Sequence, residues 1–393
     1  MLLQKIKALA KQYANEFIQV RHHIHANPEL SYQEFETSKF VQSKLAEFGI
    51  PFTIKATTGV VGILKGNNPE KRVIALRADM DALPIQEEND IPYKSTKPGI
   101  MHACGHDVHT TCLLGAAKIL SETKDDWEGT IKLIFQPGEE KNPGGASLMI
   151  KEGVLQEDPK PQAICALHVN PQLETGLLSF RSGKVMASAD ELYITIKGKG
   201  GHAAAPHLTT DTILIASHLI VSLQQIISRN NNPFSPSVLS ISSIHGGFTT
   251  NVIPTEVKLM GTFRAMDEEW RFKAHELIRK QTIGLVESMG AEVDLHIDIG
   301  YPCVYNNEAL HEKARKLGVD YMGAANVQET EMRMGAEDFG YYSQQIPGCF
   351  FRLGTANKAK GITSGVHTPV FNIDESAIET GIGIMAWMGA NIR

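Results

Sequence analysis

The chain has 393 residues, of which 42% are hydrophobic and 21% are charged. This composition is typical of a globular protein with a large core, and the length predicts roughly two or three domains. The formal net charge is −6, and no run of Lys and Arg is of the kind that follows phosphates, so nucleic acid is excluded as an expected partner. No apolar stretch approaches the roughly 20 residues that span a bilayer, and we expect no membrane partner.

The five cysteines are odd in number and scattered, and none of them forms a C-x-x-C pair. This pattern does not indicate a disulfide framework, and it favours a reducing, cytoplasmic location. In that compartment Cys104 would be available to a metal as a thiolate. At the start of the chain, lysines at helical spacing predict a surface helix rather than a signal peptide.

The first half of the chain alternates helical and strand-like patterns. A helix is predicted over 3–25, and a second near Ser31–Glu34, where the Ser-x-x-Glu spacing is typical of a capping box. Strands alternating with helices indicate a mostly parallel, doubly wound α/β sheet. The strands are expected at 73–78, 131–135 and 163–168, and the next helices at about 108–120 and 145–152.

From Leu192 the pattern changes to that of an α+β domain. Its expected order, β-α-β-β-α-β, is that of a ferredoxin-like unit. We therefore expect an inserted domain over 186–298, with the first domain formed by 1–185 and 299–393. The predicted strands are 192–197, 238–244, 256–264 and 293–297, and the predicted helices are 210–229 and 268–289.

The segment 101–109 crowds the side chains of His102, Cys104, His106 and His109 into a short stretch. Imidazoles and thiolates are soft or borderline metal ligands, so this segment predicts a metal site. Cys104 and His106 are close enough to share one site or to serve two adjacent ones. His102 and His109 are weaker candidates.

Asp79 and Asp81 follow the strand predicted at 73–78. A metal-bound imidazole usually donates its other N–H group to a carboxylate, so these aspartates are candidates to orient the ligands. The alternative is that Asp81 simply caps the turn before Pro84.

The adjacent carboxylates Glu139 and Glu140 follow another predicted strand. Neighbouring side chains point in different directions, so one carboxylate could bind a metal while the other reaches a bound water. A metal lowers the pKa of such a water, and a carboxylate can then accept its proton. The alternative is a solvated Glu-Glu-Lys loop.

His168 and His367 are more distant candidates. Either histidine alone is more often structural than a ligand. They become candidates because Cys104, His106 and Glu140 leave a two-metal site short of ligands.

Within the predicted insert, His202 lies in the segment 201–207, Asn251 in 251–254 and Arg264 in 261–264. An imidazole, an amide and a guanidinium on one small domain suit an oxyanion and a substrate carboxylate. Each of the three also has an ordinary structural interpretation.

Taken together, these motifs resemble the two-metal amidohydrolases of the aminoacylase–carboxypeptidase clan. The branch that they resemble most contains N-acyl-amino-acid amidohydrolases, hippurate hydrolases and plant auxin-conjugate hydrolases. The matching segments are 21–34, 77–84, 102–109, 136–140, 167–171, 201–207, 336–339 and 367–375.

The resemblance implies roles for the metal ligands. Cys104 matches the position that bridges two metals, where related branches have Asp. His106 and His168 match ligands of one ion, and Glu140 and His367 match ligands of the other.

Further roles are implied for residues that act on the substrate. Glu139 matches the general base. His202 and Asn251 match lid residues that hold the scissile carbonyl, and a partner subunit could supply these lid residues. Arg264 would clamp a carboxylate. Asp79 and Asp81 would lie behind the ligands.

The implied activity is metal-dependent hydrolysis of the amide bond of N-acyl L-amino acids, which releases a carboxylic acid and a free amino acid. The implied fold is a parallel-sheet catalytic domain with a ferredoxin-like lid and dimerisation domain, and the implied assembly is a homodimer. Two divalent ions per subunit are implied: Zn²⁺ or Mn²⁺, while Ni²⁺ and Co²⁺ also fit. The alternatives are a dipeptidase or carboxypeptidase on the same scaffold, a non-catalytic metal-binding relative, and a metal-free structural protein.

Overall fold

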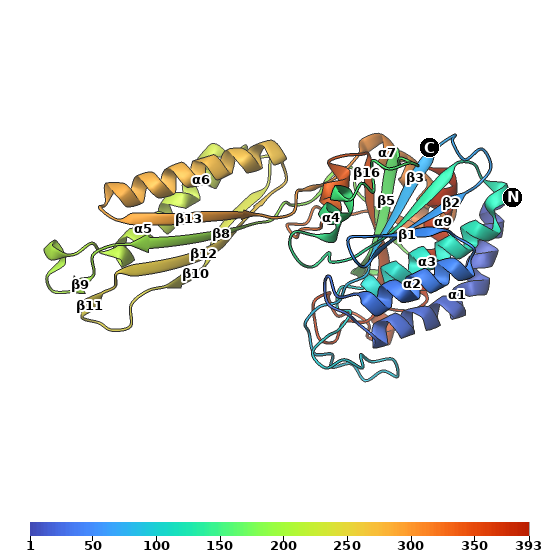
Figure 1. Cartoon of the computed structure of the whole chain (residues 1–393), viewed down its shortest axis with the longest axis horizontal. Coiled ribbons are helices and arrows are strands. Elements are labelled where there is room, and N and C mark those ends of the chain that lie inside the picture. Colours follow the sequence, from blue (N-terminus) through green and yellow to red (C-terminus); the bar gives the residue numbers. More distant parts are fainter. Residues whose placement is uncertain (393) are drawn as a thin grey trace. The chain divides into compact units, whose positions relative to one another are not determined.

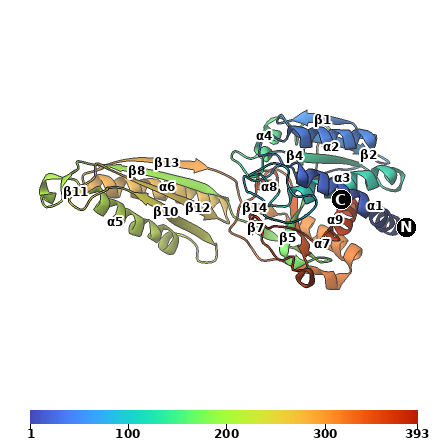
Figure 2. The same cartoon turned by 90° about the horizontal axis from the view of Figure 1, so that it is seen from below.

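The computed structural model describes residues 1–392, which form two compact units (Figures 1 and 2). The first unit comprises Met1–Val185, Tyr305–Glu331 and Tyr341–Arg393, of which Arg393 lies outside the described residues. The second unit comprises Met186–Val304 and Met332–Gly340. Each unit has its own apolar core.

In the described part of the first unit, eight strands form one sheet in the order β1-β2-β4-β3-β5-β16-β6-β15. The central strands β4, β3, β5 and β16 are parallel to one another, and antiparallel pairs lie towards the edges. The predicted mostly parallel sheet is thus confirmed. The strands are β1 (Phe52–Lys55), β2 (Gly59–Lys65), β3 (Val73–Asp79), β4 (Thr130–Gln136), β5 (Ala163–Glu174), β6 (Leu178–Phe180), β15 (Val327–Glu329) and β16 (Gly348–Ala356).

Helices cover both faces of this sheet. Gly59 and Gly62 point to opposite faces of β2; a side chain at Gly59 would meet Met149 of α4, and one at Gly62 would meet Leu45 of α2. Every residue of β4 is buried, as expected for a strand covered on both sides. The helices of this unit are α1 (Leu2–Ala26), α2 (Phe35–Glu47), α3 (His106–Glu122), α4 (Gly145–Lys151), α7 (Glu308–Met322) and α9 (Ala377–Asn391), and α8 (Phe339–Ser343) begins in the second unit and ends in the first.

In the described part of the second unit, four antiparallel strands form a sheet in the order β10-β12-β8-β13. Along the chain the elements run β8, α5, β10, β12, α6, β13, which confirms the predicted ferredoxin-like order. Buried and exposed residues alternate along β8, so one face of the sheet packs on its helices. The elements are β8 (Asp190–Lys197), β9 (Gly201–His202), α5 (Thr212–Gln225), β10 (Ser237–His245), β11 (Val252–Ile253), β12 (Glu256–Ala265), α6 (Glu268–Ser288) and β13 (Glu292–Ile299), with the short pair β7 (Gly183–Met186) and β14 (Val304–Asn306) where the chain enters and leaves the unit.

One segment of the second unit corrects the expectation about apolar stretches. Thr212–Asn230 forms a continuous helical segment of 19 residues with a mean hydropathy of 1.2, so by length and composition alone it could cross a membrane. Its buried side chains, among them Leu219 and Leu223, belong to the core of the second unit. A third of its most apolar window (33%) is buried.

Two local predictions were wrong. The strand expected to end at His168 continues to Glu174, because His168 and the residues after it pair with β16. The capping box at Ser31–Glu34 does not form: α2 begins at Phe35 and has no side-chain cap. The side chains of Ser31 and Glu34 instead bond to distant parts of the chain.

A buried ion-pair network joins β8 to α6 in the second unit. Asp190, at the start of β8, accepts hydrogen bonds from Arg271 Nε at 2.9 Å, His275 Nε2 at 2.7 Å and Gly300 N at 3.2 Å. Burial tends to raise the pKa of Asp190, but the bonds from Arg271 and His275 outweigh burial and lower it. The native state therefore favours the ionised carboxylate.

We predict that Asp190→Ala lowers the free energy of unfolding by about 3 kcal/mol, because it leaves the buried Arg271 with only the partly exposed Glu268 as a counter-charge. Chemical denaturation at neutral pH measures this loss. Because the pKa of Asp190 is depressed in the folded state, the wild-type advantage should shrink as the pH falls below the ordinary value of 3.8. The control is Asp294→Ala, which removes the exposed pair with Lys197 and should leave the unfolding midpoint unchanged. An equal loss in both variants would contradict the prediction.

Candidate metal centre

The candidate ligands of the first unit gather where parallel strands end. Asp79 on β3 is in register with Gln136 on β4, and β3 also pairs with β5. The carboxyl ends of these strands therefore meet at one edge of the sheet, where open α/β folds place their chemistry. Asp81 follows β3, Glu139 and Glu140 follow β4, and His168 lies on β5.

The loop that carries Cys104 leads directly into α3, whose first residue is His106. Between them, Gly105 has a φ of +86° and lies so close to β5 that a side chain would meet Val169 at 2.6 Å. Only glycine combines this backbone conformation with this approach. The close contact brings Cys104 and His106 against His168.

Cys104 belongs to two groups of potential metal ligands. One group contains Cys104, His106 and His168, and the other contains Cys104, Glu140 and His367; in each group the donor atoms lie within 4.8 Å of one another. Cys104 Sγ is 3.6 Å from His168 Nε2, and His367 Nε2 is 3.2 Å from Glu140 Oε1. A thiol shared by two sets of donors is the geometry expected for a ligand that bridges two ions.

The ring orientations of His106 and His168 leave one nitrogen of each directed into this cluster. His106 Nδ1 lies 3.1 Å from Asp81 Oδ1, and His168 Nδ1 donates to Val169 O at 2.8 Å. His106 Nε2 is buried without a hydrogen-bond partner, which is costly for a polar atom unless a ligand satisfies it. An imidazole held at Nδ1 and open at Nε2 is ready to bind a metal, so the residues present fit metal ions.

His367 reaches the cluster from a strained backbone position. Its φ is +62°, an uncommon value for a residue other than glycine, and its N–H donates to Ala103 O at 2.7 Å beside Cys104. Such strain is often found at functional sites, where the surrounding structure enforces it. The bond to Ala103 ties His367 to the loop that carries Cys104.

Negative charge dominates the cluster. Contacts with Cys104 and Glu140 raise the pKa of His367 to about 10. Burial lowers the pKa of His106, but Asp79 and Cys104 outweigh burial and raise it well above its ordinary value. The same anionic surroundings would attract divalent cations. Burial and then Glu140 raise the pKa of the Cys104 thiol, so a bound cation is what would favour its thiolate.

Asp81 ties the ligands and the Glu139–Glu140 loop together. Its buried carboxylate faces His106 Nδ1 and accepts from the backbone N–H groups of Glu139 and Glu140, both at 3.0 Å, and from Ser31 Oγ at 2.6 Å. These partners come from three separate segments of the chain. The structure thus favours the interpretation that Asp81 orients the ligands over a turn cap before Pro84.

Glu139 lies beside the candidate ligands and, like Glu140, approaches His106. Its side chain is mostly buried, and its Oε2 is 4.0 Å from His106 Nε2, while Glu140 Oε1 is 3.9 Å from the same atom. Glu140 Oε1 also lies 3.2 Å from His367 Nε2. Glu140 therefore contacts candidate ligands of both groups.

Two histidines of the 101–109 segment do not join the shared cluster. His109 Nδ1 is 2.6 Å from Asp79 Oδ1, and its Nε2 accepts from Val169 N at 2.9 Å, so both nitrogens are occupied. His102 is buried with no hydrogen-bond partner on either ring nitrogen, and burial lowers its pKa to about 4. Asp79 also pairs with Arg77 at 2.6 Å, which leaves it as a support for His109.

The candidate residues of the insert lie in the second unit. His202 on β9 and Asn251 beside β11 are exposed and close together, because β9 pairs with β11 and Ala203 N donates to Asn251 O at 3.0 Å. His202 Nδ1 accepts from Ala204 N at 3.1 Å, which places the proton of the neutral ring on Nε2. Arg264 lies on β12, paired with Val238, and donates to Thr262 Oγ1.

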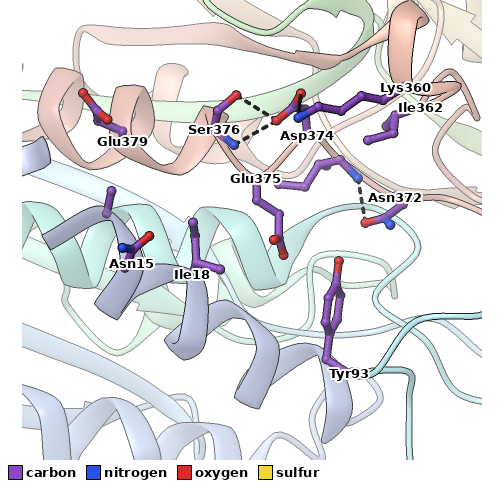
Figure 3. A pocket seen from close by; sticks show the side chains of 12 residues that line it. Asn15, Ile18, Tyr93, Lys360, Ile362, Asn372, Asp374, Glu375, Ser376 and Glu379 are labelled. Atoms are coloured by element: carbon purple, nitrogen blue, oxygen red, sulfur yellow. Dashed lines mark hydrogen bonds and ion pairs between the residues drawn. The ribbon is translucent and has the colours of Figure 1, made fainter.

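No local sequence pattern showed that the buried guanidinium of Arg21 supports the segment that carries Cys104 and His106. Arg21 of α1 donates to Asp107, next to His106, at 2.9 Å, and also to Glu375 and Asn372 at 3.1 Å. Figure 3 shows Glu375 and Asn372 in the wall of a separate cavity of about 420 Å³. The only signal was that Arg21 begins a family-like segment, because a single arginine on a helix does not reveal its partners.

Comparison with known proteins decides the family. The model of "Peptidase family M20/M25/M40" matches residues 75–388. The chain belongs to the peptidase family M20/M25/M40. As a member of this family it is a metal-dependent amidohydrolase or peptidase, and the predicted family relationship is confirmed.

Relatives of this M20/M25/M40 member carry several activities in their names. It is 40% identical to thermostable carboxypeptidase 2 of Saccharolobus solfataricus, over 97% of this chain and 96% of the relative. It is 41% identical to IAA-amino acid hydrolase ILR1-like 4 of Arabidopsis thaliana, over 98% of this chain and 88% of the relative. It is 40% identical to N-acetyl-L-cysteine deacetylase of Bacillus subtilis, over 92% of this chain and 85% of the relative.

A solved structure adds information on metal binding in the M20/M25/M40 family. The YXEP protein of Bacillus subtilis, described as a dinuclear metal-binding peptidase of the M20 family, superposes with a TM-score of 0.84 at 33% identity. The match covers 97% of this chain and 98% of that structure. The fold is thus shared along nearly the whole chain.

Proposed function

We propose that the protein hydrolyses the amide bond of N-acyl L-amino acids, releasing a carboxylic acid and a free amino acid. The observation that carries this proposal is the pair of ligand groups that share Cys104, with Glu139 beside them. The names of the deacetylase and the IAA-amino acid hydrolase support the substrate class.

In this proposal the site holds two divalent ions. Cys104 would bridge them, with His106 and His168 on one ion and Glu140 and His367 on the other. The dinuclear YXEP protein supports the number of ions. When bound, the ions polarise the amide carbonyl and lower the pKa of a water molecule. Thiolate and imidazole ligands favour Zn²⁺, and the carboxylate also suits Mn²⁺.

The side chains then move protons and bind the substrate. Glu139 would accept the proton of the attacking water and later pass it to the leaving amine. His202 Nε2–H and the amide of Asn251 would donate to the oxyanion that develops on the carbonyl. Arg264 would pair with the substrate carboxylate. The tautomer of His202 supports its assignment as a donor.

Domain roles follow from these residues. We propose that 1–185 and 299–393 form the catalytic domain and that 186–298 is the lid and dimerisation domain. Val221 and Leu214, seven residues apart on α5, are 74% and 49% exposed and lie on one face of the helix, which supports a homodimer through this domain. Light scattering should give twice the 43.1 kDa mass of the chain; a monomer would refute the dimer. The five free cysteines support a reducing, cytoplasmic location.

A carboxypeptidase or dipeptidase activity is the second candidate. The identity of 40% with thermostable carboxypeptidase 2 favours it. Both candidates require the same metal chemistry, so the substrate must decide between them.

The test is release of free amino acid from N-acetyl, N-benzoyl and N-indolylacetyl amino acids, with unblocked dipeptides alongside. Each substrate is assayed with the purified protein, after chelation, and after Zn²⁺ or Mn²⁺ is added back. We expect chelation to abolish cleavage of the acylated substrates and metal to restore it. Cleavage of the dipeptides alone would assign the protein to the peptidases. No turnover with metal bound would support a non-catalytic relative.

We predict that Glu139→Ala retains bound metal and lowers kcat by about 10²–10⁴-fold, because a general base contributes that much. Metal content is measured by elemental analysis and kcat with the best substrate of the panel. Glu47→Ala, at an exposed position on α2, is the control and should match wild type. Near-normal turnover of Glu139→Ala would show that another group accepts the proton.

A further inference from the structure

The segment Ser31–Glu34 directs its side chains toward the catalytic loop instead of capping α2. Ser31 bonds to Asp81, and Glu34 and Tyr32 bond to the loop 138–144, which carries Glu139 and Glu140. The contacts of Glu34 and Tyr32 with this loop join positions 104 to 112 residues apart in the sequence. Ser31, Tyr32 and Glu34 do not belong to any of the groups of potential metal ligands among the described residues.

Glu34 is fully buried and its carboxylate is used as a hydrogen-bond acceptor. Oε1 accepts from Gly138 N and from Tyr32 N, both at 2.8 Å, and Oε2 accepts from Thr58 Oγ1 at 2.8 Å. Burial and then the like charge of Asp81 raise the pKa of Glu34 to about 7. Burying a carboxyl group beside another carboxylate costs free energy. The hydrogen bonds from the loop to Glu34 offset part of this cost.

Tyr32 holds the same loop at two further points. Its hydroxyl donates to Lys141 O and accepts from Gly144 N at 3.0 Å. The ring covers Gly138, whose φ is +57° and where a side chain would lie 2.3 Å from Tyr32 Cε1. Gly138, the residue just before Glu139, is therefore enclosed by Tyr32, and its N–H, in the Pro137–Gly138 peptide, is bonded to Glu34.

We propose that Glu34 is a positioning residue for Glu139: by accepting the Gly138 N–H it fixes the peptide that precedes the general base. This inference rests on the proposed role of Glu139 as the base. Glu34 does not reach the reacting atoms, and it acts by holding the loop in place. A displacement of about 1 Å in a catalytic group can cost about 10²-fold in rate.

The proposal makes hydrogen-bond acceptance, rather than charge, the function of Glu34. Gln at this position keeps a carbonyl oxygen for Gly138 N and Tyr32 N, and the Thr58 hydroxyl can rotate to accept from the amide. Leu keeps the size but removes every acceptor. The pair Glu34→Gln and Glu34→Leu therefore separates the two roles.

The experiment compares kcat, KM and metal content of the metal-loaded Glu34→Leu, Glu34→Gln and Tyr32→Phe variants with those of wild type. We expect Glu34→Leu to lower kcat by about 10²-fold, with KM within about threefold and metal content unchanged. Glu34→Gln should restore kcat to within about fivefold of wild type. Should Glu34→Leu fail to fold, Tyr32→Phe carries the test, because it removes only the hydroxyl contacts and should lower kcat by about tenfold with metal retained.

Three results would overturn the inference. The first is a wild-type kcat in Glu34→Leu, or in Tyr32→Phe if the Glu34→Leu variant does not fold. The second is a loss of metal that parallels the loss of kcat, and the third is an equal loss of kcat in Glu34→Gln and Glu34→Leu. Measuring Glu139→Ala in the same experiment shows whether the positioning role of Glu34 fails or the proposed function itself fails. If Glu139→Ala is active, the base assignment fails, and the role of Glu34 fails with it. If Glu139→Ala is inactive and Glu34→Leu is normal, only the positioning role fails.

Discussion

The buried carboxylate of Asp81 is the interaction on which the rest of the site depends. It faces His106 and accepts from the backbone of Glu139 and Glu140 and from Ser31, so it joins the end of β3 to α3, to the loop after β4 and to the segment before α2. A carboxylate without these donors would be too costly to bury. Bonding one side chain to all of these groups fixes the distances between them before any metal or substrate binds.

This arrangement concentrates negative charge on one side of the parallel sheet. The carboxylates of Asp79, Asp81, Glu139 and Glu140 lie around imidazoles that are held at Nδ1. The raised pKa values of His106 and His367 reflect this charge. Because metal ligands must be deprotonated to bind, metal affinity should increase with pH.

The sequence could predict the parts of this account that depend on local patterns. Cys104 and His106 are two residues apart in a histidine-rich segment, and Glu139 and Glu140 are adjacent after a predicted strand, so both pairs were recognisable without a fold. His168 and His367 lie far from them and from each other, and they became candidates only because the nearer residues left a two-metal site short of ligands. The capping box failed because the side chains of Ser31 and Glu34 found partners in Asp81 and Gly138, and no local pattern contains that information. The sequence could not show that both nitrogens of His109 are occupied, because their partners Asp79 and Val169 are also distant in sequence.

If Cys104 bridges two metal ions, X-ray absorption spectroscopy of the zinc-loaded protein should detect its sulfur. We expect a zinc–sulfur distance of about 2.3 Å in wild type. This signal should persist in Cys112→Ala, which removes a buried thiol of α3. In Cys104→Asp it should disappear while two ions per chain remain bound. Sulfur scattering that is absent from wild type, or that survives in Cys104→Asp, would show that Cys104 does not bind the metals.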